Sequence, residues 1–151
     1  MVDVVDTATR SRMMSGIRGK DTKPELAVRK GLHARGFRYR LHSSKVCGKP
    51  DLVLARYRAL IFVHGCFWHG HDCHLFKMPS TRPEFWKAKI NRNRERDAEV
   101  RVSVLESGWR HLVIWECALK GKTRLEFETL MVRLSTWIMG DELEGQISGE
   151  G

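Results

Sequence analysis

The sequence predicts an α/β protein in which helices flank a mixed β-sheet. Apolar strand-like segments alternate with segments of helical periodicity, in the order α-α-β-β-β-α-β-α. A long helical segment joins two of the apolar strands, and such a crossover returns the chain parallel to the earlier strand. The chain has 151 residues, 42% of them hydrophobic, which suffices to bury one core and predicts a single domain.

Two helices are predicted before residue 37. Residues 9–18 form a short basic segment that carries Met13, Met14 and Ile17 among arginines. The second helix begins at Thr22, because the TKPE sequence has capping-box spacing and an early proline, and it ends near Gly36. A basic N-terminal region should therefore precede the first strand.

Three strands are expected to follow. In residues 37–41, aromatic and apolar side chains alternate with arginines, which is the period of a half-buried strand. Residues 51–54 and 60–63 contain apolar runs separated by a tight connection. These three strands should form a hairpin-like meander.

A long helix, a strand and a last helix are predicted in the second half of the chain. The long helix begins at Pro83 and ends at Gly108, and one of its faces carries Trp86, Ile90, Asn93, Asp97, Arg101 and Val104. A strand over residues 109–115 and an amphipathic helix over residues 125–138 follow. The acidic, glycine-rich tail from Gly140 is expected to fray. Three tryptophans of this half are interpreted as core residues: Trp109, Trp115 and Trp137.

The composition indicates a nucleic acid partner and a reducing compartment. The formal net charge is +9, and a basic surface of this kind attracts polyanions. The four cysteines could form two disulfides, but no N-terminal segment resembles a signal peptide, so reduced thiols in the cytoplasm fit better. No apolar run approaches membrane-spanning length, and we expect no membrane partner.

Residues 61–74, IFVHGCFWHGHDCH, concentrate metal-ligand side chains directly behind a strand. Cys66, His71 and Cys73 are close enough in sequence for one loop to fold around one ion, and this ligand set suits Zn²⁺. The fourth ligand could come from three places, which are Cys117 beyond a distant strand, His69 and His74. The alternative interpretation is a loop of polar histidines with buried free thiols.

Three ionisable residues are predicted to converge at one edge of the sheet. Asp51 begins a central strand, His64 ends the neighbouring strand, and Asp97 interrupts the apolar stripe of the long helix. Such convergence is typical of a catalytic site. The alternative for Asp51 is a simple turn, because proline and aspartate are both favoured turn residues.

Six segments carry a resemblance to a known family. They are ATRSRMMSGIRGKD from Ala8, TKPE from Thr22, GKPD from Gly48, FVHGCFWHGHDCH from Phe62, TRPEFWKAKINRNRERD from Thr81 and VIWEC from Val113. Over nearly its whole length the chain resembles the very-short-patch repair (Vsr) endonucleases, which nick DNA at mismatches. The resemblance implies a restriction-endonuclease-like core with a structural zinc site, in the αβββαβ order that the residue patterns also predict.

The resemblance also implies an active site. Asp51 would hold Mg²⁺ together with the main-chain carbonyl of Val63, a position where typical members carry threonine. His69 would be the general base toward the attacking water. Supporting active-site positions are matched by Glu25, His64 and Asp97. For Glu25, the capping box of the second helix is an alternative explanation.

The resemblance implies a structural zinc ion with four protein ligands, which are Cys66, His71, Cys73 and Cys117. Phe67 and Trp68, with Trp86 at the start of the long helix, resemble the aromatic wedge that such enzymes insert beside the mismatch. The alternative is that these rings only cover the zinc. Basic residues of the long helix, including Lys89 and Arg92, are expected to contact phosphate. The segment with Met14 and Ile17 resembles the family's DNA-gripping arm.

The activity implied by the resemblance is Mg²⁺-dependent nicking of double-stranded DNA, 5′ of the thymine in T·G mismatches left by deamination of 5-methylcytosine. A monomer is expected, with residues 1–20 as a DNA-gripping arm, 21–139 as the catalytic domain and 140–151 as a flexible tail. The expected location is the bacterial cytoplasm, and mismatch-repair proteins are candidate partners. The alternatives are a dimeric restriction-type nuclease and a zinc-stabilised DNA-binding module without catalysis.

Overall fold

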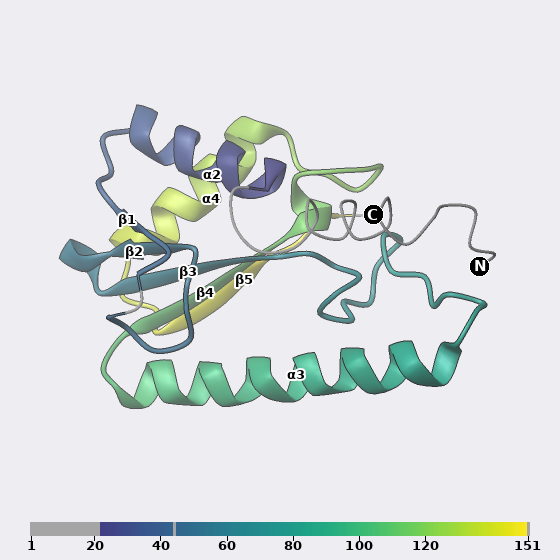
Figure 1. The fold of residues 1–151 in the computed structure, drawn as a ribbon. Coiled ribbons are helices and arrows are strands. Elements are labelled where there is room, and N and C mark those ends of the chain that lie inside the picture. The colour runs from purple at the N-terminus through teal and green to yellow at the C-terminus, as the bar shows by residue number, and fades with distance from the viewer. Residues whose placement is uncertain (1–21, 44, 151) are drawn as a thin grey trace.

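The computed structural model describes residues 22–43 and 45–150, which form a five-stranded mixed sheet between helices (Figure 1). The basic helix predicted over residues 9–18 lies outside the described residues, and so do Met14 and Ile17. From the second predicted helix to the last one, the elements follow the predicted order, and one further strand comes after them.

Helix α2, Lys23–Ala34, begins where the capping signal predicts. The Thr22 hydroxyl oxygen accepts a hydrogen bond from Glu25 N at 3.4 Å, and a proline occupies the first turn. One face of α2 is buried in the core through Val28 and Leu32. These contacts fix α2, the first element of the described residues, against the body of the protein.

The strands are β1 (Arg40–Leu41), β2 (Leu52–Leu54), β3 (Ala59–His64), β4 (Arg110–Trp115) and β5 (Glu144–Ile147), and they lie in this order across the sheet. β1, β2 and β3 are antiparallel neighbours, which confirms the predicted meander. β3 and β4 are parallel and are joined through α3 (Pro83–Glu106), which confirms the predicted crossover. Short 3-10 turns follow β2 and β4, at Ala55–Tyr57 and Glu116–Ala118.

The first strand is shorter than predicted. Only Arg40 and Leu41 of the described residues before β2 pair with it, and both are exposed. Phe37 instead closes the preceding helix, because its N–H donates to Leu32 O at 3.0 Å and its ring is buried in the core. The alternating pattern of residues 37–41 therefore begins with a residue that belongs to the end of the helix.

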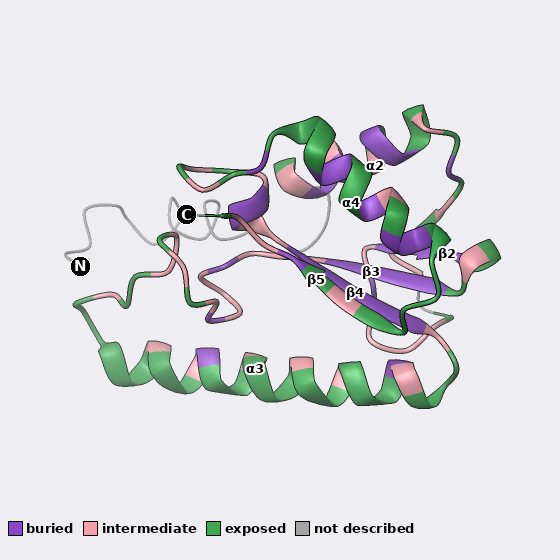
Figure 2. Cartoon of the chain, turned by 180° about the vertical axis from the view of Figure 1, so that it is seen from behind, coloured by how far each residue is buried: buried purple, intermediate pink, exposed green. Residues whose placement is uncertain are grey.

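The helices cover both faces of the sheet. α2 and α4 (Phe127–Met139) lie on one face and enclose the main core, and α3 lies along the other face (Figure 1). The core on the α3 side is smaller and consists of Val53, Leu60, Phe62, Val104 and Val113. α3 is exposed along most of its length (Figure 2), and its buried residues are Ile90 and Val104. Much of α3 is therefore available for other contacts.

The predicted fraying of the C-terminal tail is wrong for residues 144–147, which form β5 beside β4. Glu144 accepts two hydrogen bonds from the Arg101 guanidinium, at 2.6 and 2.8 Å, and Gln146 accepts one from the Trp115 indole at 2.8 Å. Partners that are distant in sequence thus order a segment whose own composition favours disorder.

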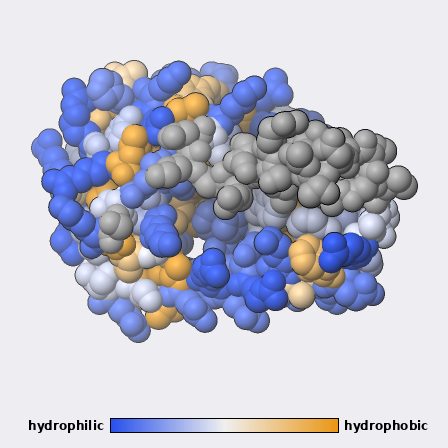
Figure 3. All heavy atoms as spheres, in the orientation of Figure 1, coloured by the Kyte–Doolittle hydropathy of each residue, from blue (hydrophilic) through white to orange (hydrophobic). Residues whose placement is uncertain are grey.

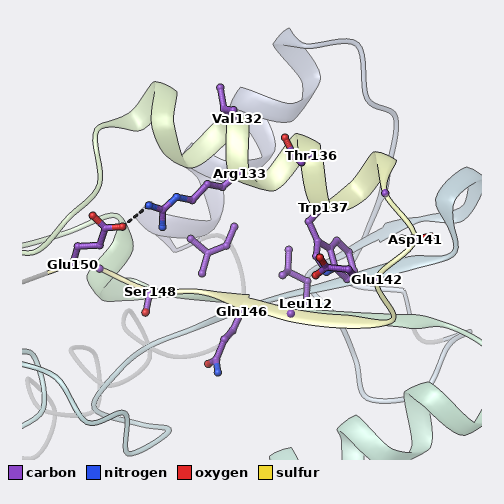
Figure 4. A pocket seen from close by; sticks show the side chains of 14 residues that line it. Leu112, Val132, Arg133, Thr136, Trp137, Asp141, Glu142, Gln146, Ser148 and Glu150 are labelled. Atoms are coloured by element: carbon purple, nitrogen blue, oxygen red, sulfur yellow. Dashed lines mark hydrogen bonds and ion pairs between the residues drawn. The ribbon is translucent and has the colours of Figure 1, made fainter.

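The surface view shows a mostly hydrophilic face (Figure 3). None of the helices in the described ranges is long and apolar enough to cross a bilayer. A cavity of about 660 Å³ lies between α4 and β5 (Figure 4), and an ion pair between Arg133 and Glu150 crosses its rim. This cavity contains none of the predicted catalytic or zinc-binding residues.

Candidate active site and metal centre

Asp51 lies directly before β2, and its carboxylate is directed at the backbone of the neighbouring strand. Val63 N in β3 donates a hydrogen bond to Asp51 Oδ2 at 2.6 Å. The main chain of Asp51 is also held, because Asp51 N donates to Ile61 O at 3.0 Å. The Pro-Asp pair is therefore more than a solvated turn, since the strand pairing fixes the carboxylate at the edge of the sheet.

Glu25 and His42 lie beside Asp51. His42 Nε2 is 2.9 Å from Glu25 Oε2, and the Arg29 guanidinium is 3.3 Å from the same oxygen. One ligand atom from each of Glu25, His42 and Asp51 lies within 4.8 Å of the others. The Glu25 side chain is 1% exposed, so the residue that starts the helix as a capping partner also brings a buried carboxylate to this group.

Burial raises the pKa of Asp51 to about 7, and the neighbouring Glu25 carboxylate acts in the same direction. The hydrogen bond from Val63 N opposes this shift, because it stabilises the charged form. Two adjacent carboxylates in a poorly solvated place repel each other, and a bound cation would remove that repulsion. The arrangement therefore has the chemistry of a divalent-cation site.

His64, His69 and Asp97 form a second group, from β3, the following loop and α3. His69 Nδ1 is 2.6 Å from Asp97 Oδ2. The His64 and His69 rings stack with centroids 3.8 Å apart and an interplanar angle of 3°. Burial and the nearby His69 lower the pKa of His64 to about 3, so His64 is neutral at pH 7. With Nδ1 committed to Asp97, His69 has Nε2 left for proton transfer.

The predicted convergence of Asp51, His64 and Asp97 is confirmed, because all three line one cavity of about 430 Å³. Val63 and His69 line the same cavity. It is smaller than the cavity between α4 and β5, but it brings together carboxylates, imidazoles and main-chain groups. We therefore take the smaller cavity as the candidate active site on chemical grounds.

Four residues form a compact cluster next to this cavity: Cys66, His71, Cys73 and Cys117. One ligand atom from each lies within 4.8 Å of the others. His71 Nδ1 is 3.5 Å from Cys66 Sγ and 3.6 Å from Cys117 Sγ. A tetrahedral zinc site with ordinary Zn–S and Zn–N bonds has N···S edges of about 3.6 Å. The donors thus fit a closed, four-ligand zinc site.

The surroundings of the cluster favour thiolates once a metal is bound. Cys117 N donates to Cys66 Sγ at 3.3 Å, and Gly149 N donates to Cys117 Sγ at the same distance. Without a cation, burial raises the pKa of both thiols. A metal ion reverses this preference, because a coordinating thiol is deprotonated. The second N–H comes from the tail that was expected to fray.

The other candidates for the fourth ligand have different partners. His69 is paired with Asp97, and the His74 ring is 3.3 Å from the Thr123 hydroxyl. Cys47, the remaining cysteine, lies 3.7 Å from the Ser107 hydroxyl. The cluster therefore contains the four residues that the family resemblance implies and leaves these three outside.

Phe67, Trp68 and Trp86 pack edge to face with one another, with ring centroids 5.2 to 5.8 Å apart. All three are partly exposed. The ring that stacks on His71 of the Cys/His cluster is Trp115, with centroids 4.1 Å apart and an interplanar angle of 7°. This arrangement favours a role for the three-ring cluster other than covering the metal.

Two polar residues that interrupt the stripe of α3, Asn93 and Asp97, hold the loop between Cys66 and His71. Asn93 Nδ2 donates to Trp68 O at 2.8 Å, and Asp97 binds His69. Lys89 Nζ lies 6.0 Å from the centre of the Trp68 ring. Arg92 is exposed on the same helix. The stripe is therefore polar where the loop docks, at Asn93 and Asp97, and again at Arg101, which pairs with Glu144.

Sequence reasoning missed two residues of the site. Trp115 was interpreted as core, but it is half-buried, stacks on His71 and lines the cavity. Its place before Cys117, at the end of a strand, was a usable signal. Of the other two tryptophans, Trp137 is buried and Trp109 is partly exposed. His42 gave no sequence signal, because only the pairing of β1 with β2 brings it to Asp51.

Comparison with known proteins gives consistent matches. A family model described as DNA mismatch endonuclease Vsr matches residues 2–75. The DNA mismatch endonuclease Vsr of Escherichia coli is 46% identical over 151 residues, which cover 100% of this chain and 97% of that protein. The type II nicking enzyme V.NmeAIP of Neisseria meningitidis is 44% identical over 81% of this chain and 87% of its own length. The type II nicking enzyme V.XorIIP of Xanthomonas oryzae is 42% identical over 83% of this chain and 93% of its own length.

Proposed function

Because this chain belongs to the Vsr family of DNA mismatch endonucleases, we propose that it nicks the thymine strand of T·G mismatches left by deamination of 5-methylcytosine. The chain is a DNA endonuclease by membership in this family. One observation carries the mechanism: Asp51, fixed by the backbone of Val63, faces the same cavity as the His69–Asp97 pair. A metal-binding carboxylate and an oriented base on either side of a phosphodiester are what its hydrolysis requires.

Asp51 would hold Mg²⁺ together with the main-chain carbonyl of Val63. The N–H and C=O of one strand residue point to the same side, and Val63 N already points at Asp51. Carboxylate and carbonyl oxygens are the ligands that Mg²⁺ prefers. When bound, the ion would stabilise negative charge on the phosphate and acidify a nearby water. Glu25 would contribute a second carboxylate to the site, next to Asp51.

His69 would accept the proton of the attacking water at Nε2. Asp97 accepts the hydrogen bond of Nδ1–H, which fixes this tautomer and stabilises the imidazolium that forms. The neutral His64 ring lies parallel to His69 and limits its rotation. Zn²⁺ on the four-residue cluster would be structural, because a site with four protein ligands has no open position for water.

The three-ring cluster would insert beside the mismatch. Unstacking a step costs a few kcal/mol and least where pairing is already faulty, so a wedge favours mismatched sites. Basic residues of α3, including the half-buried Lys89 and the exposed Arg92, would contact phosphates on either side. Met14 and Ile17 would belong to the arm over residues 1–20 that grips the DNA.

The proposed molecule is a cytoplasmic monomer with one active site per bound duplex, and mismatch-repair proteins are proposed partners. Residues 21–139 would form its restriction-endonuclease-like core, for which the order α2-β1-β2-β3-α3-β4 is the supporting observation. A single site suits a nick, whereas a restriction enzyme that cuts both strands needs two sites related by symmetry.

Replacement of Asp51 tests the proposal. Asp51→Asn should abolish nicking of T·G duplex in Mg²⁺ while mismatch binding persists, because the change removes a cation ligand and leaves the rings intact. His69→Ala should reduce the nicking rate by roughly 10²- to 10⁴-fold, the usual contribution of a general base. Both variants should keep one equivalent of zinc in elemental analysis. Undiminished turnover of Asp51→Asn would rule out this active site.

A further inference from the structure

We infer that His42 is a third side-chain ligand, with Asp51 and Glu25, for the divalent cation of the active site, and that it makes this site accept Mn²⁺ in preference to Mg²⁺. The inference rests on the proposed function of Asp51. It goes beyond that function because it adds an imidazole to a site otherwise built from oxygens.

The backbone brings His42 to this place. His42 directly follows β1, and its N–H donates to Asp51 O at 3.2 Å, which extends the pairing of Leu41 with Leu52 by one residue. The φ angle of His42 is 47°, in the left-handed region that non-glycine residues rarely adopt. The fold therefore holds His42 opposite Asp51 in a conformation that costs free energy, and such conformations gather at functional sites.

The donor atoms have the spacing of neighbouring ligands. An octahedral ion with metal–ligand bonds of about 2.1 Å has edges of about 3 Å. His42 Nε2 and Glu25 Oε2 are 2.9 Å apart, and each of the three residues has a donor within 4.8 Å of the others. Asp51, Glu25 and His42 are therefore close enough to one another to hold one ion.

The charges and ligand types decide which ion fits. Arg29 lies 3.3 Å from Glu25 Oε2, so one positive charge already offsets part of the negative charge of the two carboxylates. Mg²⁺ is bound mainly through its charge and by oxygen ligands, and it gives up its bound waters reluctantly. Imidazole suits first-row transition metals, whereas carboxylates serve Mg²⁺ and Mn²⁺ alike. A histidine added to a site of reduced charge therefore shifts its preference toward Mn²⁺.

The alternative role for His42 is to hydrogen-bond Glu25 without touching the ion. The two roles differ in whether a nitrogen is bonded to the metal. Electron spin-echo envelope modulation detects such a nitrogen on Mn²⁺, and the measurement needs no catalysis. We would use the full chain with its zinc, without DNA, and add MnCl₂ to wild type, His42→Gln, His42→Asn, Asp51→Ala and the control His33→Gln. His33 is an exposed histidine of α2.

The wild type and His33→Gln should show the ¹⁴N modulation of one bound imidazole. Both His42 variants should lose it and bind Mn²⁺ roughly tenfold more weakly by titration, while their Mg²⁺ affinity changes less. Asp51→Ala should bind neither ion at this site. Zinc content and circular dichroism show whether each variant is folded. Two different substitutions of His42 are used so that the test can still be made if one of them fails to fold.

Nitrogen modulation that persists in the folded His42 variants would overturn the inference, and so would Mn²⁺ bound by the wild type without any modulation. Either result leaves the proposed function intact if Asp51→Asn abolishes nicking. If Asp51→Asn nicks normally, the proposed function itself fails. The two failures are therefore distinguishable.

Discussion

Asp51 carries a charge that its position disfavours. The carboxylate is largely buried and lies beside Glu25, and these two causes raise its pKa to about 7 in the absence of metal. One N–H, from Val63, compensates only in part. A proton and a divalent cation therefore compete for the same group near neutral pH.

This competition predicts how nicking depends on pH. Only the deprotonated carboxylate binds the ion, so the rate should rise with pH through a midpoint at or below about 7. Raising Mg²⁺ favours the deprotonated form, and the midpoint should fall by about one pH unit per tenfold increase in Mg²⁺ once the concentration exceeds the Kd of the deprotonated site. Single-turnover rates over a grid of pH and Mg²⁺ concentration measure this. A midpoint that does not change with Mg²⁺ concentration would assign the titration to a group other than Asp51.

Individual residues of the site differ in how far the sequence reveals them. Asp51 and Asp97 are predictable, because one starts an apolar strand and the other breaks an apolar helix face. Glu25 looks like a helix cap from its spacing, and the structure gives it the capping contact and the site contact at once. His42 is not predictable, since its position depends on a two-residue strand and a left-handed φ angle.

The loop between Cys66 and Cys73 is held by several elements at once. The turn after β4 supplies Cys117, α3 supplies Asn93 and Asp97, and the tail supplies Gly149 N–H to the Cys117 sulfur. These bonds add to the packing of Phe67 and Trp68 on Trp86 and restrict the movement of the loop. The Cys/His cluster thus connects this loop to the segments that follow β4 and β5.

The role of the tail predicts the effect of a single methyl group. A Cβ at Gly149 would lie 2.5 Å from Thr123 Oγ1 and 2.6 Å from Thr123 O. Gly149→Ala should therefore lower the free energy of unfolding by about 1–3 kcal/mol, as overpacking does, and speed zinc release to a chelator. Ser148→Ala and Cys47→Ser are the controls. Unchanged melting and zinc retention in Gly149→Ala would mean that the tail does not bind the zinc site.

The three-ring cluster makes a prediction about selectivity. Trp68→Ala should lose more affinity for T·G duplex than for matched duplex, because each lost base–aromatic stack is worth about 1–3 kcal/mol. Arg92→Ala should weaken both duplexes alike and flatten the salt dependence, as loss of a phosphate contact does. Fluorescence anisotropy at several salt concentrations measures both. Equal losses on the two duplexes for Trp68→Ala would contradict the wedge.

Helices whose own sequence has a periodic apolar pattern are predictable, whereas segments that are ordered by residues distant in the sequence are not. α2, α3 and α4 lie where the spacing and caps place them. β5 is different, because acidic and glycine residues fill a segment that is ordered by Arg101 and Trp115. The same reason explains why β1 is short, because Phe37 is hydrogen-bonded to the end of α2 and does not pair with β2.

At the scale of the whole molecule, the charge is distributed unevenly. The chain carries a net charge of +9, yet four acidic residues lie in its last eleven, at positions 141, 142, 144 and 150. Four exposed basic residues of α3 lie on the other layer: Lys87, Arg92, Arg94 and Arg96. A fifth, Arg101, is paired with Glu144 of β5. A polyanion should therefore approach along α3 and not along the α4–β5 side.

This asymmetry predicts a nick on one strand. One cation site, one base and one ring cluster fix the protein in a single orientation on a mismatch, which itself lacks two-fold symmetry. On a hemimethylated duplex with T·G in a methyltransferase-like site, the cut should fall immediately 5′ of the thymine and leave the other strand intact. Separately labelled strands on a sequencing gel, with a matched C·G control, measure this. Comparable cuts on both strands would instead indicate a dimeric restriction-type nuclease, and binding without Mg²⁺-dependent cleavage of any mismatch would indicate a DNA-binding module.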